Sequence, residues 1–285
     1  MTSTRAESKS SGNKSSKGTQ AERADKFRCY QLSVQAADHE VEFFEKAYRE
    51  AGGRNPISLQ EDFCGTFAVC CEWVKKNPER SAVGVDLCGE TLQWGQHHNL
   101  SQLEEGERDR IQLIEQDVRQ KNPVQADVLA AQNFSFWIFK TRREVVEYFR
   151  VARSNLNDGG IMVMDMMGGG DCYNEGQVDK RTIKKGRKGF KYHWKQESFN
   201  PVTADASFSI SFKFKDGSKL KRAFEYHWRF WTIPEVREML AEAGFRSSKV
   251  YWEQEDEDGA DTGEWAAGED APSYPSWICY VVAVR

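Results

Sequence analysis

Residues 56–87 read PISLQEDFCGTFAVCCEWVKKNPERSAVGVDL, and this stretch decides the fold class. Residues 56–63 have the composition of a strand, residues 67–76 have apolar side chains at helical spacing, and residues 81–87 form a second apolar run. A strand, a helix and a buried strand in this order are typical of two parallel strands joined by a crossover helix.

The same alternation continues outward on both sides of this stretch. Upstream, residues 26–52 carry apolar side chains at helix spacing. Downstream we expect a helix at 90–103, a strand at 111–118, a strand within 126–136, a helix at 141–156 and a strand at 161–166. The pattern predicts an α/β fold with a Rossmann-like, mostly parallel sheet and helices on both faces. We assign this core, with its N-terminal helix, to residues 26–167.

The rhythm changes after Gly168, where three segments resemble antiparallel strands: 190–199, 206–215 and 220–230. We expect residues 168–230 to form an antiparallel β cap inserted after the fifth strand. A helix at 234–243 and strands at 248–252 and 277–284 then return to the core, so that residues 231–285 form its C-terminal part. Within it, residues 253–270 hold nine acidic residues and no Lys or Arg, which predicts a solvated, mobile loop.

Composition limits the remaining possibilities. Residues 1–25 are rich in Ser, Lys and Gly and predict a disordered tail, with a transit peptide as the alternative. The net charge of −4 does not suggest a dedicated nucleic-acid binder, and no apolar run is long enough to cross a bilayer. The seven Cys lack CxxC spacing, so we expect reduced thiols, a cytoplasmic location and no metal site.

Polar residues end each strand of the expected sheet: Glu61, Asp86, Asp117, Asn133 and Asp165. In open parallel sheets, ligands bind beyond the carboxyl ends of the strands. Successive polar endings on one rim are hard to explain by core packing. They therefore predict a ligand site on this rim.

The turn at residues 64–66 with its acid at Glu61, followed by Asp86, Asp117 and Asn133 in that order, resembles the small-molecule class I S-adenosylmethionine-dependent methyltransferases. Residues 231–245 also resemble the late helix of that superfamily. The resemblance implies S-adenosylmethionine as methyl donor and a small polar metabolite as acceptor. The residues that we expect at the donor are Tyr30, Glu61, Phe63, Gly65, Asp86, Leu87, Asp117, Val118, Asn133 and Phe134.

Several of these positions have a second interpretation. Asp86 either accepts hydrogen bonds from the ribose diol or caps the following helix. Asp117 either binds the adenine amino group, beside the Val118 amide, or is a turn residue. Glu61 either holds loop amides or touches the donor, and Tyr30 either closes over the donor or packs.

One departure from the usual GxGxG turn distinguishes the possible cofactors. Only Gly65 remains, because Phe63 and Phe67 occupy the flanking positions, where glycine permits positive φ. A dinucleotide site needs the full glycine set to cradle its pyrophosphate. S-adenosylmethionine has no phosphate, so the departure argues against NAD.

We expect the cap to cover the acceptor, with contacts from Phe136, Asp165, Tyr226, Trp228 and Arg229. Arg229 would hold a substrate carboxylate, or else stack on a Trp or pair with Glu225. Methyl transfer needs alignment and exclusion of water more than one universal catalytic residue. An amine acceptor would still need a base, for which the candidates are Asp165, His193, Glu225 and His227.

Two other functions remain open at this point. The basic segment 180–195 would suit an RNA or protein methyltransferase that contacts phosphates or acidic side chains. A non-catalytic binding module would keep the fold without holding the donor.

Overall fold

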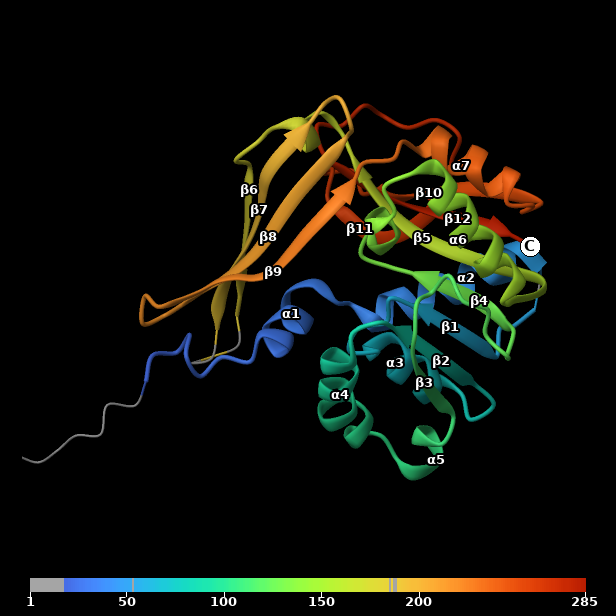
Figure 1. Cartoon of the computed structure of the whole chain (residues 1–285), viewed down its shortest axis with the longest axis horizontal. Helices are drawn as coiled ribbons and strands as arrows, with labels where there is room; N and C mark the ends of the chain where they lie inside the picture. The colour runs from blue at the N-terminus through green and yellow to red at the C-terminus, as the bar shows by residue number, and fades with distance from the viewer. Residues whose placement is uncertain (1–17, 53, 185, 187–188) are drawn as a thin grey trace, which may run out of the picture.

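The computed structural model describes residues 18–52, 54–184, 186 and 189–285 (Figure 1). Most of the expected tail, residues 1–17, lies outside this part, as do three basic positions of the 180–195 segment (185, 187 and 188). The described chain forms two sheets, one of eight strands and one of four. The α/β core and the antiparallel cap that the sequence predicts are both confirmed.

The large sheet has the strand order β11-β10-β12-β5-β4-β1-β2-β3. Its strands are β1 (Ser58–Asp62), β2 (Ser81–Asp86), β3 (Ile111–Glu115), β4 (Ala126–Ala131), β5 (Leu156–Gly168), β10 (Ser247–Glu255), β11 (Asp261–Ala267) and β12 (Trp277–Val284). β1 to β5 pair in parallel, whereas β12 lies antiparallel between β5 and β10. The order reverses between β1 and β4, which is where ligands bind in such sheets.

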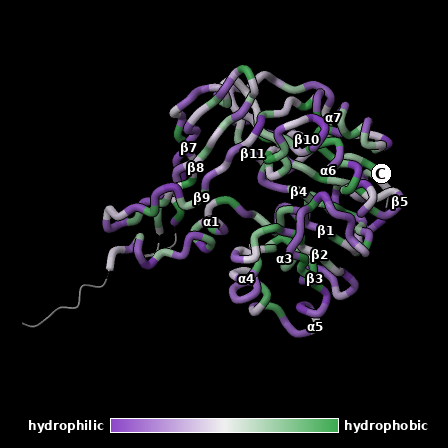
Figure 2. The backbone as a smooth tube through the Cα atoms, in the orientation of Figure 1, coloured by the Kyte–Doolittle hydropathy of each residue, from purple (hydrophilic) through white to green (hydrophobic). Residues whose placement is uncertain are grey.

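Helices cover both faces of this sheet, as the alternation predicts. The helices are α1 (Lys26–Val34), α2 (Ala37–Gly52), α3 (Ala68–Lys76), α4 (Gly89–His98), α5 (Glu105–Arg108), α6 (Arg142–Ser154) and α7 (Ile233–Glu242), with short 3-10 turns at Leu100–Gln102, Ser135–Ile138 and Gly170–Tyr173. Val128 and Ala130 of β4 pack with α2 and α3, whereas Leu129 and Ala131 pack with α6 and α7. Successive strand residues point to opposite faces, so residues 128–131 of β4 are apolar on both faces of the sheet. Figure 2 shows how hydrophobic and hydrophilic residues are distributed along the backbone.

The small sheet is the cap, and it stands beside the core (Figure 1). Its strands pair antiparallel in the order β6 (Val178–Ile183), β7 (Phe190–Asn200), β8 (Asp205–Phe214) and β9 (Lys219–Arg229). The sequence did not predict β6, because this edge strand is exposed along most of its length and carries no alternating apolar pattern.

The N-terminal segment differs from expectation in two ways. Residues 26–52 form two helices, because the chain is extended at Gln35 between α1 and α2. Residues 18–25, expected in the disordered tail, are ordered: the Gln20 and Ala21 amides donate to Asp216 and Ser218 at the β8–β9 turn. The Asp25 side chain accepts hydrogen bonds from the first amides of α1 and so begins this helix. Phe27 of α1 contacts Phe224 of the cap and Trp94 of the core, so α1 lies between the cap and the core (Figure 1).

The acidic segment 253–270 is a β-hairpin where a mobile loop was expected. β10 continues to Glu255 and pairs antiparallel with β11, whose acidic side chains face solvent while its main chain is paired. Trp265 anchors the hairpin against Phe43 and Tyr280, at ring-centroid distances of 5.9 and 4.5 Å. Among the described helices, each is too short or too polar to cross a bilayer.

Candidate active site

The β1–α3 turn keeps a glycine-type backbone although two of its residues are Phe. Phe63, Gly65 and Phe67 all have positive φ, at 55°, 53° and 47°. For a residue other than glycine this conformation costs about 1–2 kcal/mol and persists only where the surrounding structure imposes it. Phe63 and Phe67 therefore adopt the positive φ that glycine permits at these positions, and the strain is concentrated at the sheet's switch point.

The Phe67 ring is accommodated by a glycine on a neighbouring helix. Phe67 is completely buried, and a Cβ built on Gly95 of α4 would lie 2.5 Å from its ring and 2.7 Å from the Thr66 carbonyl oxygen. Asn99 at the end of α4 donates to that same carbonyl at 2.8 Å. The close approach that glycine usually provides inside the turn is thus provided by the helix that packs on it.

Two buried carboxyls lie at the end of β1. Glu61 accepts hydrogen bonds from the amide and thiol of Cys70 in α3, at 3.2 and 3.0 Å. Asp62 accepts from Gln60 and from the Tyr148 hydroxyl. Burial raises the pKa of each carboxyl to about 7. Glu61 therefore holds an amide in the first turn of α3, where a loop amide or the donor was expected, and it also borders a cavity over the β1–α3 turn.

Asp86 at the end of β2 also braces the turn. Its Oδ2 accepts from the Gly65 amide at 2.7 Å, and its Oδ1 accepts from the Cys88 amide at 2.8 Å, just before α4. A carboxylate has about four acceptor positions, so each oxygen can accept one further hydrogen bond. A ribose diol would fit that remaining capacity. The adjacent Leu87 is 71 % exposed. It could therefore provide an apolar contact for an adenosine group at this edge of the sheet.

Asp117, beyond β3, is engaged with its own neighbour. The Arg119 guanidinium and amide both donate to its carboxylate, at distances from 2.6 to 3.2 Å, and this lowers the pKa of Asp117. Arg119 also lies over the Phe139 ring. An adenine amino group could bind Asp117 only after Arg119 moved. Val118 is buried.

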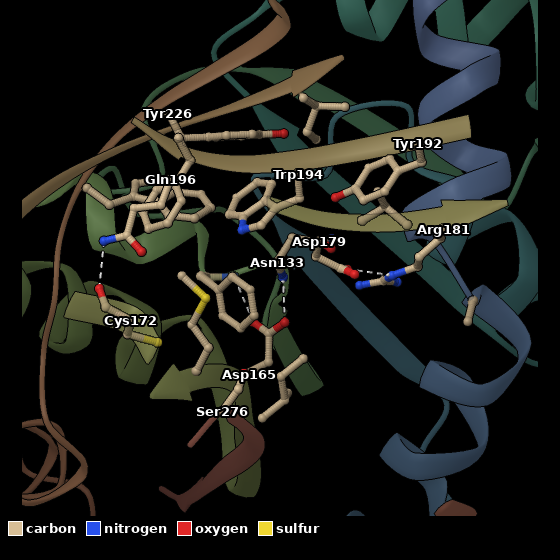
Figure 3. A pocket seen from close by; sticks show the side chains of 18 of the residues that line it. Asn133, Asp165, Cys172, Asp179, Arg181, Tyr192, Trp194, Gln196, Tyr226 and Ser276 are labelled. Atoms are coloured by element: carbon tan, nitrogen blue, oxygen red, sulfur yellow. Dashed lines mark hydrogen bonds and ion pairs between the residues drawn. The ribbon is translucent and has the colours of Figure 1, made fainter. Parts of the chain in front are cut away.

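The loop after β4 is shaped by Asp165 of β5. Asn133 and Phe134 have positive φ, and their amides donate to the two Asp165 oxygens at 2.9 and 2.8 Å (Figure 3). Burial raises the pKa of Asp165 to about 7. This carboxyl is therefore a loop-positioning group on a cavity wall.

Two cavities meet at this rim. The smaller, about 150 Å³, lies over the β1–α3 turn and is bordered by Gln35, Glu61 and Gly65. The larger, about 620 Å³, lies between the core and the cap. Both are lined by the same three residues, Tyr30 of α1, Asn133 and Tyr226 of β9. Each of Tyr30 and Tyr226 is among the groups that shift the pKa of the other, so the hydroxyls of α1 and of the cap lie close together at the junction.

The larger cavity has aromatic walls and several carboxyl groups. Trp194 and Tyr226 of the cap face Asp165 of the core across it (Figure 3). Its carboxyl groups come from Glu40, Asp165, Asp171, Asp179 and Glu253. One guanidinium also lines it, that of Arg181, and Asp179 binds this group at 3.0 Å. Carboxyl groups thus outnumber cationic side chains in the lining of this cavity.

The structure places several of the expected residues in these walls. Tyr30, Asn133, Phe134, Asp165, Tyr226 and Trp228 line the larger cavity, and Glu61, Phe63 and Gly65 line the smaller one. Asp86 lies beside the smaller cavity through its bond to Gly65.

Phe136 and Arg229, expected at the acceptor, lie elsewhere. Phe136 is fully buried in the core among Trp137 and Phe149, so it has no surface for a ligand. Arg229 stacks on Trp231 at 3.9 Å and donates to the Lys140 carbonyl, as its alternative interpretation predicted, and so fastens the cap to the core.

Three of the four candidate bases also lie outside the larger cavity. Glu225 pairs with Arg222, and His227 borders a separate groove near Lys140. His193 is on β7, where burial and nearby lysines lower its pKa.

Sequence reasoning missed Glu40 of α2, which is buried in the larger cavity's wall. A signal was present. Val41, Phe43, Phe44 and Ala47 define the apolar face of this helix, and Glu40 lies on that face at the i−3 and i−4 positions of Phe43 and Phe44. A charged residue on the buried face of an amphipathic helix indicates a polar contact in the interior.

No protein-family profile matches the chain, and no match is found among curated proteins. Solved structures do match. The amino pentose methyltransferase CalS10 of Micromonospora echinaspora, determined with bound S-adenosylmethionine, is 16% identical with a TM-score of 0.65, over 91% of this chain and 95% of that one. DesVI of Streptomyces venezuelae is 14% identical with a TM-score of 0.67, over 92% and 98%. The sugar N-methyltransferase KedS8 of a Streptoalloteichus species is 14% identical with a TM-score of 0.63, over 100% and 98%.

These likenesses extend over the core and the cap. The chain therefore has the fold of the class I S-adenosylmethionine-dependent methyltransferases. It carries a four-stranded antiparallel cap beside the core.

Proposed function

We propose that this protein is an S-adenosylmethionine-dependent methyltransferase that methylates a small polar metabolite. The observation that carries the proposal is the meeting of two cavities at Tyr30, Asn133 and Tyr226. The smaller cavity lies over the turn that corresponds to the donor-binding loop of the fold. The larger one is enclosed by the cap and has room for a metabolite-sized acceptor. A donor bound in the smaller cavity could therefore present its methyl group, at the junction, to an acceptor in the larger cavity.

The residues present fit the donor. Gln35 has a buried carbonyl oxygen, Oε1, without a hydrogen-bond partner among the described residues, and it borders the smaller cavity beside Glu61. Such an acceptor suits the donor's α-ammonium group. Asp86 has remaining capacity for a ribose diol, and Leu87 is exposed beside it. These groups offer no cation for a pyrophosphate, which favours S-adenosylmethionine over NAD.

The protein's contribution to the reaction is alignment and exclusion of water. The donor supplies a methyl group activated by its bond to a positively charged sulfur. When a nucleophile attacks this methyl in line, the sulfur leaves as a neutral thioether. Tyr30 and Tyr226 line both cavities at the junction, so they restrict the path by which the acceptor can approach the donor. Trp194 and Trp228 form an apolar wall that keeps water from the path. Fixing two reactants in this way supplies much of the rate enhancement of such reactions.

We further propose that the acceptor atom is an amine nitrogen. Two of the structural neighbours are described as an amino pentose methyltransferase and a sugar N-methyltransferase. The carboxyl-rich lining of the larger cavity is consistent with an amino acceptor. An amine with a pKa near 10 is only about 0.1% neutral at pH 7, so the site must lower that barrier by roughly 4 kcal/mol.

The test is methylation of a small-molecule extract with isotopically labelled S-adenosylmethionine, read by mass spectrometry. Wild type should label a discrete amine, and Asp86→Ala should label far less of it. Labelling of RNA or protein without any metabolite product would overturn the small-acceptor proposal.

The basic segment 180–195 supports RNA or protein as the second candidate. Lys180 of β6, Lys184 just after β6 and Lys191 of β7 are exposed. Use of that face would leave the enclosed cavity without a role, so we rank it second. Salt-dependent RNA binding that is lost on neutralising these lysines would favour it.

A further inference from the structure

Glu40 is a buried carboxyl with an unused oxygen. It lies in the first turn of α2, is only 8 % exposed, and forms part of the larger cavity's wall. Its Oε2 has no hydrogen-bond partner within the described part of the chain. A buried polar group without a partner is costly, and a buried charge more so. Such a group in a cavity wall indicates a ligand that supplies the missing donor.

The other buried carboxyls near it are already occupied. Glu61 accepts from the Cys70 amide and thiol, Asp62 from Gln60 and Tyr148, and Asp165 from two loop amides. Each of these groups holds the protein's own structure in place. Glu40 is therefore the member of the set that is available to a molecule in the cavity.

The charges around the cavity favour a cation. Asp171, Asp179 and Glu253 line it together with Glu40 and Asp165. The guanidinium of Arg181 is bound by Asp179, and His39 is the remaining lining side chain that can carry positive charge. A phosphate or free carboxylate on the acceptor would meet repulsion from those carboxyls that are ionised, because like charges repel strongly in a poorly hydrated site.

We propose that Glu40 binds the ammonium group of the acceptor and takes its proton, and that the carboxyl-lined cavity selects acceptors without anionic groups. This inference rests on the proposed methyl transfer and names a residue for it. In the step, one N–H proton moves from the ammonium to Glu40 Oε2, which leaves a neutral amine. The nitrogen lone pair then forms the N–C bond to the donor methyl as the C–S bond breaks, and its electron pair stays on sulfur.

The surroundings match Glu40 to this task. Burial, and then the carboxyls of Glu61 on β1 and Asp165 on β5, raise the pKa of Glu40 to about 8. Tyr30 of α1 and Tyr280 of β12 also face it, and Asp38 lies on its own helix. A base works best when its pKa lies near the working pH, because it is then both available and strong enough.

A fragment experiment tests the ammonium site without knowing the acceptor. The full-length protein, with ¹³C-labelled glutamate carboxyls, is titrated with pH in the presence and absence of ethylammonium chloride, with and without S-adenosylhomocysteine. The Glu40 signal is assigned by its loss in Glu40→Gln. Ethylammonium should lower the Glu40 pKa by at least about one unit, and ethanol should leave it unchanged. An equal Glu40 pKa in all three solutions would overturn the proposal.

Kinetics give the second readout, with the labelled amine found in the metabolite screen as substrate. Glu40→Gln should lower kcat/KM at pH 7 by about a hundredfold or more, the usual range for loss of a positioned base, and should abolish the inflection near pH 8. Glu42→Gln is the matched control, because Glu42 is on the same helix with its side chain 64% exposed. Equal kcat/KM in the two variants would contradict the role of Glu40.

The outcomes separate this inference from the proposed function. If S-adenosylhomocysteine does not bind, the methyltransferase proposal fails, whereas the ethylammonium effect on Glu40 can still be measured. If S-adenosylhomocysteine binds and ethylammonium has no effect, the Glu40 inference alone fails.

Discussion

Gly95→Ala tests how the β1–α3 turn tolerates Phe67. In an exposed helix, replacing glycine by alanine stabilises by about 1 kcal/mol, because alanine has the higher helix propensity. At Gly95 the added Cβ would lie 2.5 and 2.9 Å from Phe67 ring atoms and 2.7 Å from the Thr66 carbonyl oxygen. The ring is completely buried and the carbonyl is main chain, so neither can move cheaply.

The gain in helix propensity and the steric overlap of the new Cβ have opposite effects on stability, and the overlap should be the larger of the two. Overpacking by one methyl group in a tight core costs about 1–3 kcal/mol. We therefore expect net destabilisation by about 1–2 kcal/mol, and a fall in Tm of about 2–4 °C for each kcal/mol. Because the displaced atoms belong to the turn over the smaller cavity, affinity for S-adenosylhomocysteine should also fall, by about threefold or more.

Urea unfolding and isothermal titration calorimetry measure the two effects. Gly106→Ala in α5 is the matched control, because a Cβ there meets nothing within 4 Å, and it should be neutral or stabilising. Phe67→Leu combined with Gly95→Ala should cost less than the sum of the single changes, because the smaller side chain relieves the overlap. A Gly95→Ala protein as stable as wild type, with unchanged ligand affinity, would refute this account of the turn.

Three further predictions follow from the site. Asp86→Ala should weaken S-adenosylhomocysteine binding at least about tenfold by calorimetry, since it removes charge-assisted hydrogen bonds, and a folded variant with full affinity would make Asp86 a purely structural brace. Arg229→Ala should lower the free energy of unfolding, measured in urea, by about 2 kcal/mol and change donor affinity by less than twofold. A selective loss of acceptor turnover would instead indicate that Arg229 contacts the substrate. The free energy of unfolding of wild type should fall as pH rises from about 5 to about 8. The pKa values of Glu40, Glu61 and Asp165 are raised in the folded state, so over this range the folded protein still binds protons that the unfolded chain has released. Glu40 alone contributes at most about 5 kcal/mol to this fall. Glu40→Gln should therefore show a smaller decrease of unfolding free energy with pH and should be more stable than wild type at pH 8. Equal decreases in the two proteins would contradict the raised pKa of Glu40.

The core could be predicted because its signals are local. The apolar run 81–87 and the helix spacing at 67–76 reflect burial of a whole strand and of one helix face, and both are visible in a few residues. β6 and β11 could not be predicted, because each is an edge strand whose side chains are mostly exposed. Their main-chain pairing with β7 and β10 leaves no pattern in the sequence.

The site could be predicted only where it follows the strand ends. Asp86, Asn133 and Asp165 lie at the expected rim because the order of parallel strands fixes where those ends meet. Arg229 was harder to place, because its partner carbonyl belongs to Lys140. That contact depends on how the cap docks on the core, which no local pattern encodes.

The most direct test of the central claim is calorimetric titration of the purified protein with S-adenosylhomocysteine. We expect one saturable site per chain, in the micromolar range or tighter, no comparable binding of NAD, and a large loss of affinity in Asp86→Ala. Absence of binding heat for S-adenosylhomocysteine in a folded protein, or equal affinity for NAD, would contradict the assignment of the smaller cavity to a methyl donor.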